Sequence, residues 1–171
     1  PNRLSNRSLN LYGGHLTING NSNAATTETT TGTLTLNAGQ SIITLSAGTG
    51  QQLNFTTSDV IRLGGNPLVP LGSTVLFRGS NLGSAAGPDT ATIRATGTGY
   101  AFIGQTGVAG AFNKGILSYA IIDATTGGSG TSFATADTAT GILRPLNATT
   151  ELVTTLTNNL GGVATPLNVS L

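Results

Sequence analysis

Few residues of this chain could do chemistry. Its 171 residues include six Asp or Glu, seven Lys or Arg and a single histidine. That histidine, His15, stands just before an apolar residue in an alternating run, so we expect its side chain to point outward without a catalytic role. A Ser-His-Asp triad is compatible with the composition, but the G-x-S-x-G motif that would present the serine is absent from the sequence.

The acidic residues are spread over the whole chain. On a regular strand repeat, Asp59 and Asp89 could lie on neighbouring turns of a fold, and Arg62 and Arg94 could do so more loosely. Polysaccharide lyases built on parallel β-helices use stacked acids to bind Ca²⁺ and an Arg or Lys as the base. The spacing here is irregular, which favours solvated charges. The full set of acids is Glu28, Asp59, Asp89, Asp123, Asp137 and Glu151.

The sequence also lacks the motifs of calcium-binding, phosphate-binding and cysteine-based sites. Gly127–Gly130 follows Asp123, but neither an EF-hand loop nor a GGxGxD repeat is present, and no P-loop lysine follows a glycine-rich stretch. The chain has no cysteine, which excludes disulfides and thiolate metal sites. The sequence therefore predicts no catalytic, cofactor-binding or metal-binding residue, and no cofactor.

The overall composition restricts the partners. Only 8% of residues are charged and the net charge is +1, without a Lys/Arg cluster, so we do not expect nucleic-acid binding. No apolar run is long enough to span a membrane. The polar residues are mainly Thr, Ser, Asn and Gln, and the 30 threonines favour strands. The chain opens Pro1-Asn2-Arg3, without Met or a signal sequence, so we expect a processed product or a piece of a larger protein.

The elements that must position these residues are short strands. The stretch 32–65 contains four apolar pairs, each split by one residue, which is typical of half-buried strands. Segments rich in Gly, Asn, Ser and Asp separate the pairs and predict turns. The pairs recur at an interval of about 27 residues, which indicates a repeating supersecondary unit. By this interval Leu16/Ile18 corresponds to Ile43/Leu45, and Leu34/Leu36 to Ile61/Leu63. The remaining pair of the stretch is Leu53/Phe55.

This recurrence predicts a fold class and the direction of the side chains. We expect an all-β protein, a right-handed parallel β-helix (β-solenoid) with roughly 22–27 residues per turn. The intervals from Leu53 to Val75 and from Val75 to Phe102 fall within this range, as a coiling chain requires. The four apolar pairs of the stretch 32–65 should point inward with Val75 and Phe77, whereas Thr33, Thr35, Thr44 and Asn54 should point outward.

Further strands are expected on both sides of this stretch. Their ranges are 8–12, 15–19, 73–78, 90–95, 116–122, 132–135 and 141–144. Residues 24–31 are expected to be an exposed loop or edge, 66–72 a corner, and 104–115 a loop or cap. We predict a β-solenoid unit over 1–146 and a C-terminal segment, 147–171, leading to the next unit or subunit. Within that segment the sequence does not decide whether a short helix forms around 152–160, and we expect 168–171 to start another strand.

Four motifs in order resemble a known family. They are NRLSNRSLNLYGGHLTING near the start, GSTVLFRGSNLG at 72–83, ILSYAIIDATTGGSGTSFATAD at 116–137 and GILRPL at 141–146. Together they resemble the autotransporter-associated β-strand repeat proteins, very large bacterial surface proteins. The resemblance implies stacked right-handed parallel β-helix units, an extracellular or cell-surface location and no catalytic residues.

Two functions follow as hypotheses. The first is a non-enzymatic structural protein, the repeat unit of a long β-solenoid stalk or filament, stacked head-to-tail with other copies or repeats of itself. Neither end of the predicted stack resembles a polar cap. The alternative is a carbohydrate-binding or carbohydrate-cleaving β-helix protein, an adhesin or polysaccharide lyase that contacts surface glycans. That alternative needs a groove lined by aromatics and acids, whereas the tyrosines are scattered in the sequence as Tyr12, Tyr100 and Tyr119.

Overall fold

The protein is built from strands. The computed structural model describes residues 2–5, 7–63, 72–97, 100–104, 108–137 and 139–152, and these contain twelve strands and no helix. The expected all-β class is confirmed. The strands are β1 (Leu9–Leu11), β2 (Gly14–Asn19), β3 (Thr26–Thr29), β4 (Leu34–Leu36), β5 (Gln40–Ser46), β6 (Leu53–Thr57), β7 (Val60–Arg62), β8 (Thr74–Gly79), β9 (Ala91–Ala95), β10 (Leu117–Asp123), β11 (Ser132–Ala136) and β12 (Leu143–Pro145).

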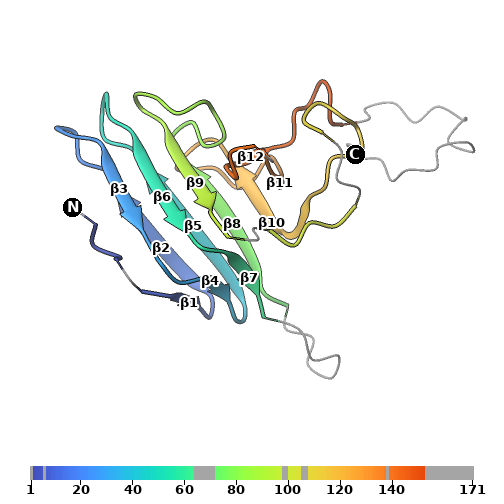
Figure 1. The fold of residues 1–171 in the computed structure, drawn as a ribbon, viewed down its shortest axis with the longest axis horizontal. Helices are drawn as coiled ribbons and strands as arrows, with labels where there is room; N and C mark the ends of the chain where they lie inside the picture. Colours follow the sequence, from blue (N-terminus) through green and yellow to red (C-terminus); the bar gives the residue numbers. More distant parts are fainter. Residues whose placement is uncertain are drawn as a thin grey trace, which may run out of the picture.

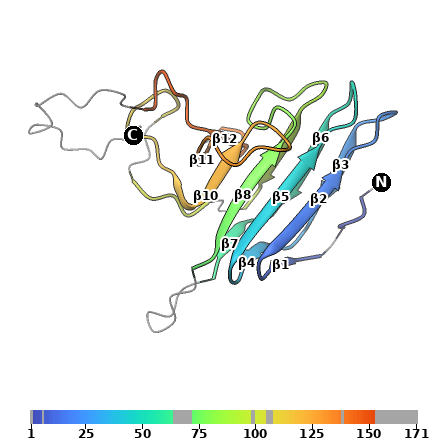
Figure 2. The ribbon, with the colours of Figure 1, turned by 180° about the vertical axis from the view of Figure 1, so that it is seen from behind.

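These strands form three sheets. Two have three strands each, in the orders β1-β4-β7 and β3-β6-β9, and the third has six strands in the order β12-β11-β10-β8-β5-β2. Strands β1, β2 and β3 lie together at one end of the molecule, drawn in blue, and β10, β11 and β12 lie at the other (Figure 1). Seen from behind, β2, β5, β8 and β10 lie side by side (Figure 2).

Neighbouring strands in the first half pair in parallel. Leu16 lies opposite Ile43 and Ile18 opposite Leu45, as the recurrence in the sequence predicts. Strands β3 and β6 keep the same interval, with Thr26 opposite Leu53. In-register parallel pairing places the side chains of equivalent positions next to each other on the same face of each sheet.

The three sheets pack around one hydrophobic core. Buried leucines, isoleucines and phenylalanines from all three contribute, and the largest fully buried side chains include Phe55 and Phe77. Across the six-stranded sheet, Leu16, Ile43, Phe77 and Ile122 follow one another in register. The expected inward direction of Leu34, Leu36, Ile43, Leu45, Leu53, Phe55, Val75 and Phe77 is confirmed, since each is at most 2% exposed.

The predicted right-handed parallel β-helix over 1–146, with roughly 22–27 residues per turn, is wrong. The strands form three open sheets, and the largest is mixed, because β11 pairs antiparallel with both β10 and β12. The spacing between partners also grows along the chain. Ser41 lies opposite Val75, Leu53 opposite Ala91, and Val75 opposite Ala120. The expected matches of Val75 with Leu53 and with Phe102 do not form.

Long connections and one reversal cause this departure. Residues 80–90 separate β8 from β9, and 96–116 separate β9 from β10, so each later strand reaches its partner only after a longer stretch of chain. The glycine-rich turn after Asp123 then turns the chain back. Strand β11 therefore runs antiparallel to β10, as expected for two strands joined by a short loop.

A shift of one residue also overturns part of the predicted core. Strand β7 sets Val60, not Ile61, opposite Leu34. Such a shift sends every side chain of a strand to the opposite face. Val60 is therefore buried, whereas Ile61 is 39% and Leu63 is 45% exposed. Thr35 and Thr44, expected to point outward, are buried.

The region around the predicted boundary at residue 146 is continuous with the sheets. Glu151 pairs with Arg144 of β12 at 2.6 Å and accepts a hydrogen bond from the main chain of Gly110. Residues 153–171 lie outside the described residues, so the expected strand at 168–171 and nearly all of the possible helix fall there. The corner expected at 66–72 also falls almost wholly outside them.

Alanine substitutions should distinguish side chains that point into the core from those that point outward. Leu45→Ala should lower the free energy of unfolding by about 2–5 kcal/mol, because it leaves a cavity in the buried ladder. Ile61→Ala, at an exposed position that sequence periodicity alone would place in the core, should cost less than about 1 kcal/mol. Urea unfolding of both variants measures the difference, and equal losses would contradict the observed register of β7.

Candidate functional site

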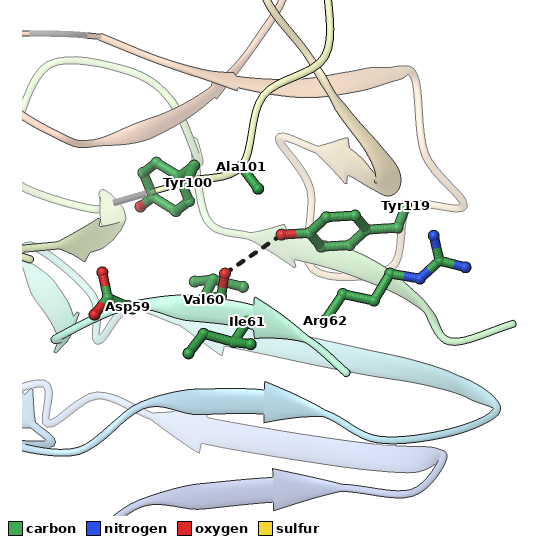
Figure 3. A pocket seen from close by; sticks show the side chains of 7 residues that line it. All are labelled: Asp59, Val60, Ile61, Arg62, Tyr100, Ala101 and Tyr119. Carbon is green, nitrogen blue, oxygen red and sulfur yellow. Dashed lines mark hydrogen bonds between the residues drawn. The ribbon is translucent and has the colours of Figure 1, made fainter. Parts of the chain in front are cut away.

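A hollow lies along the outer side of β7. It is a cavity of about 350 Å³ whose lining combines one acid, one arginine, two tyrosines and small apolar groups. The lining residues are Asp59, Val60, Ile61, Arg62, Tyr100, Ala101 and Tyr119. Figure 3 shows Asp59 at one end of β7, Arg62 at the other, and the two tyrosines above the strand. A volume of this size is at the lower limit for sites that hold small molecules.

Tyr119 closes one side of this cavity. It projects from β10, is 6% exposed, and donates a hydrogen bond from its hydroxyl to the carbonyl oxygen of Val60 at 3.4 Å. The guanidinium carbon of Arg62 lies 5.8 Å from the centre of the Tyr119 ring, a cation–π distance. Burial raises the pKa of Tyr119, against a smaller opposing effect of Arg62, so the phenol stays protonated and can donate.

Tyr100 stands on the opposite side, held by its own hydroxyl. The oxygen accepts from the main-chain N–H of Ala95 at 2.9 Å and donates to the carbonyl of Gly141 at 3.0 Å. Burial raises the pKa of this phenol far above its ordinary value of 10.0. Its ring packs at 54° against Phe102, with the ring centres 5.6 Å apart. Tyr100 is therefore a fixed wall.

A second cavity, of about 370 Å³, lies on the other side of Tyr100. Besides Tyr100 and Phe102, its lining brings together Arg94 of β9 and Asp137, which follows β11. The remaining lining residues are small: Ala95, Thr96, Gly97, Ala136, Ala139, Thr140 and Gly141. Tyr100 thus lines two hollows, and each of them contains one arginine and one aspartate.

The structure changes the sequence-based view of this region. The tyrosines were expected to be scattered, but Tyr100 and Tyr119 line the same cavity. Asp59 and Asp89, whose irregular spacing argued against stacking, do not stack. Asp59 follows β6, whereas Asp89 precedes β9 and its N–H donates to the carbonyl of Gln51 ahead of β6. No periodic signal could have joined Tyr100 to Tyr119, since loops of irregular length bring them together.

The other acids considered in the sequence stabilise turns. Asp123 accepts hydrogen bonds from the main-chain and hydroxyl groups of Thr125 and from the N–H of Gly130. Burial raises its pKa, but these donors outweigh burial and lower the pKa below 3.8. Asp89 accepts from the N–H of Gly50 at 2.6 Å. His15 is exposed on β2, and no cluster of metal-ligating side chains exists within the described residues.

A buried carboxylate that the sequence analysis missed lies at the N-terminal end of the sheets. Glu28 of β3 is fully buried in register with Phe55 and Ile93, where an apolar residue is expected. Its carboxylate accepts hydrogen bonds from the main chain of Arg3 and Leu4, and its pair with the Arg3 side chain is 2.7 Å long. Burial raises the pKa of Glu28, but these donors lower it below 4.5. Glu28 lies one predicted repeat before Phe55, and this interval could have indicated from the sequence that Glu28 occupies a core position.

Residues 2–4 thereby cover part of this end, contrary to the expectation that it lacks a cap. The side chain of Asn2 accepts from the N–H of Thr29 on β3, and the Arg3 guanidinium donates to the carbonyl of Asn19. Strands β1 and β2 remain the edges of their sheets. The N–H of Gly20 donates to Ser46 of β5, and the N–H of Leu9 donates to Thr33, next to β4. Because main-chain groups alternate in direction along a strand, those of Asn10, His15 and Thr17 point away from these neighbours, toward the open side.

The opposite end of the molecule carries a second buried acid. Glu151 is fully buried and makes two short contacts to the Arg144 guanidinium, at 2.7 and 2.6 Å. It also accepts from the N–H groups of Asn147 and Gly110. Burial raises the pKa of Glu151, but Arg144 and these N–H groups outweigh it and lower the pKa to about 2.

Comparisons with known proteins add no relative. No protein-family model, no curated protein and no solved structure matches this chain. No described helix is long and apolar enough to cross a membrane.

The low pKa of Glu151 predicts loss of stability in acid. A carboxyl whose pKa is lower in the folded state stabilises the fold above its unfolded pKa, near 4.5, and loses that contribution as the pH falls toward about 2. Glu151→Gln should remove this part of the pH dependence, so its stability should change less between pH 5 and pH 2.5 than that of the wild type. Urea midpoints at the two pH values provide the measurement.

Arg144→Gln tests the same pair from the other side. It leaves Glu151 buried and ionised without its cation, so it should destabilise more at pH 7 than at low pH. Identical pH profiles for the wild type and Glu151→Gln would contradict the assignment.

Proposed function

We propose that this chain is a non-catalytic structural part of an extracellular or bacterial cell-surface protein. In this proposal it associates head-to-tail with other copies or repeats of itself. The observation that carries the proposal is the edge formed by β1 and β2, where the main-chain groups of Asn10, His15 and Thr17 face no described strand. An open sheet edge pairs readily with a further strand.

The side chains at this edge also favour association. Leu9, Leu11 and Leu16 are only partly buried, although they pack against the core. An added strand would cover them and would extend the rows in which Leu9 pairs with Leu34 and Leu16 pairs with Ile43. Lysines, which usually protect open edges, are absent from β1 and β2.

The sequence supplies a candidate for the added strand. Leu167-Asn168-Val169-Ser170-Leu171 alternates in the same way as Leu9-Asn10-Leu11. We assign this segment of a neighbouring copy to the open edge. The two ends of the molecule differ, because the far edge strand, β12, contains Pro145, and proline protects an edge. A contact between unlike ends continues indefinitely, so its product is a filament.

Composition and resemblance support the location. The cysteine-free chain is rich in Thr and Gly, and its motifs resemble those of autotransporter-associated β-strand repeat proteins of bacterial surfaces.

A proline on the open edge tests the association. Thr17→Pro removes an N–H that points away from β5, so the sheet should keep its internal hydrogen bonds while the next strand loses a donor. The wild-type protein should form filaments in electron micrographs and a concentration-dependent mass in light scattering, and Thr17→Pro should remain monomeric. Thr17→Val, which keeps the N–H, is the matched control.

Deletion of residues 167–171 provides a second test, which leaves β2 unaltered. It should also abolish filaments, with circular dichroism and thermal melting unchanged. A wild-type protein that stays monomeric at every concentration would refute the proposal. A closed dimer, or filaments that persist in both variants, would refute the head-to-tail contact.

A further inference from the structure

The two cavities that flank Tyr100 are neighbours. Tyr100 lines both of them, and the carboxylate of Asp59 in the first lies against Gly97 in the second. A Cβ at Gly97 would come within 2.7 Å of Asp59, so glycine allows this close approach. We name the two cavities together the Tyr100 groove, defined by Asp59, Arg62, Tyr119, Tyr100, Arg94 and Asp137.

The charges along the Tyr100 groove are balanced and repeated. Arg62 and Arg94 are exposed, whereas Asp59 and Asp137 are half-buried, with one residue of each kind in each cavity. Anionic ligands such as phosphates or polyuronates would meet a carboxylate wherever they meet an arginine. A divalent cation would find a single acid in each cavity. The arrangement favours a ligand without net charge.

The lining also specifies what that ligand should offer. Carboxylates accept hydrogen bonds and guanidinium groups donate them, so hydroxyl groups, which do both, suit both kinds of side chain. The rings of Tyr100 and Phe102, which are only partly buried, provide apolar surface for C–H groups. We propose that the Tyr100 groove binds a neutral oligosaccharide, with one sugar subsite on each side of Tyr100.

This inference does not depend on the proposed self-association. The groove lies beside β7, β9 and β10, whereas the open edge belongs to β1 and β2 at the blue end of the molecule (Figure 1). A filament of this chain would thus carry a glycan contact on every copy. Either property can fail without the other.

The test is binding of defined sugars to the full chain. The probes are the neutral di- and hexasaccharides of the cello-, malto-, manno-, xylo- and laminari- series, with oligogalacturonate and a random peptide library as comparators. Ligand-observed NMR detects contact and calorimetry measures affinity. At least one neutral hexasaccharide should bind, on the order of millimolar or tighter, and at least about tenfold tighter than its disaccharide. Tyr100 stands between the two subsites, so only the longer chain spans it and fills both.

Two substitutions link binding to the groove. Arg62→Gln and Arg94→Gln are exposed changes that remove one charged donor from each cavity. Each should weaken binding of the hexasaccharide about tenfold. Arg94→Gln should also reduce the advantage of the hexasaccharide over the disaccharide. Arg7→Gln, an exposed arginine outside the groove, is the matched control and should bind like the wild type.

Several results would overturn the inference. These are no binding of any neutral sugar, tighter binding of oligogalacturonate or of peptides, equal affinity for the di- and hexasaccharides, or unchanged binding in both groove variants. Circular dichroism of each variant establishes that it is folded. Should Arg62→Gln fail to fold, Ile61→Gln places a longer polar side chain at the exposed rim of the same cavity and should also weaken binding.

Discussion

Parallel pairing between strands that are distant in sequence is the constraint on which the rest of this structure depends. Leu16, Ile43, Phe77 and Ile122 come from four different strands, yet they follow one another in a single row on the core side of the sheet. Parallel neighbours cannot be joined by a tight turn. The chain therefore passes through the other two sheets before it returns, and all three sheets come to share one core.

A glutamate paired with an arginine is buried at each end of the molecule. Glu28 stands at the end of the row that contains Phe55, and Glu151 pairs with Arg144 of β12 at the far end. Each carboxylate also accepts main-chain N–H groups, which offsets the cost of its burial. Main-chain donors near each end are satisfied in this way without another strand.

The proposed properties belong to regions where this pairing is incomplete. At β2 the pairing stops because no described strand lies beyond it, and the exposed main-chain groups are those that a neighbouring copy could use. Beside β7 the ladder is reduced to a single bridge between Val60 and Tyr100, and the space that a full strand would occupy is bordered by side chains from β7 and β10. One region favours a protein partner, and the other favours a small polar ligand.

Local periodicity in the sequence was sufficient for most of the strands and most of the core. It missed β3, because residues 24–31, with few apolar side chains, were expected to be an exposed loop or edge. Alternation at Leu34/Leu36 and Leu53/Phe55 predicted buried faces correctly, and the recurrence of Leu16 at Ile43 predicted their pairing. These properties depend on residues one or two positions apart, or on connections of equal length. The predicted β-helix failed where connections lengthened and where the turn after Asp123 reversed the chain.

Tertiary structure alone decided the remaining features. A shift of one residue in β7 buried Val60 and exposed Ile61, and nothing in the local sequence distinguishes the two registers. The meeting of Tyr100 with Tyr119, and of Arg94 with Asp137, depends on the path of loops between β9 and β12. Alternation determines which face of a strand is apolar. Which residues meet across the core is set by loop lengths and packing, and these have no periodic signal in the sequence.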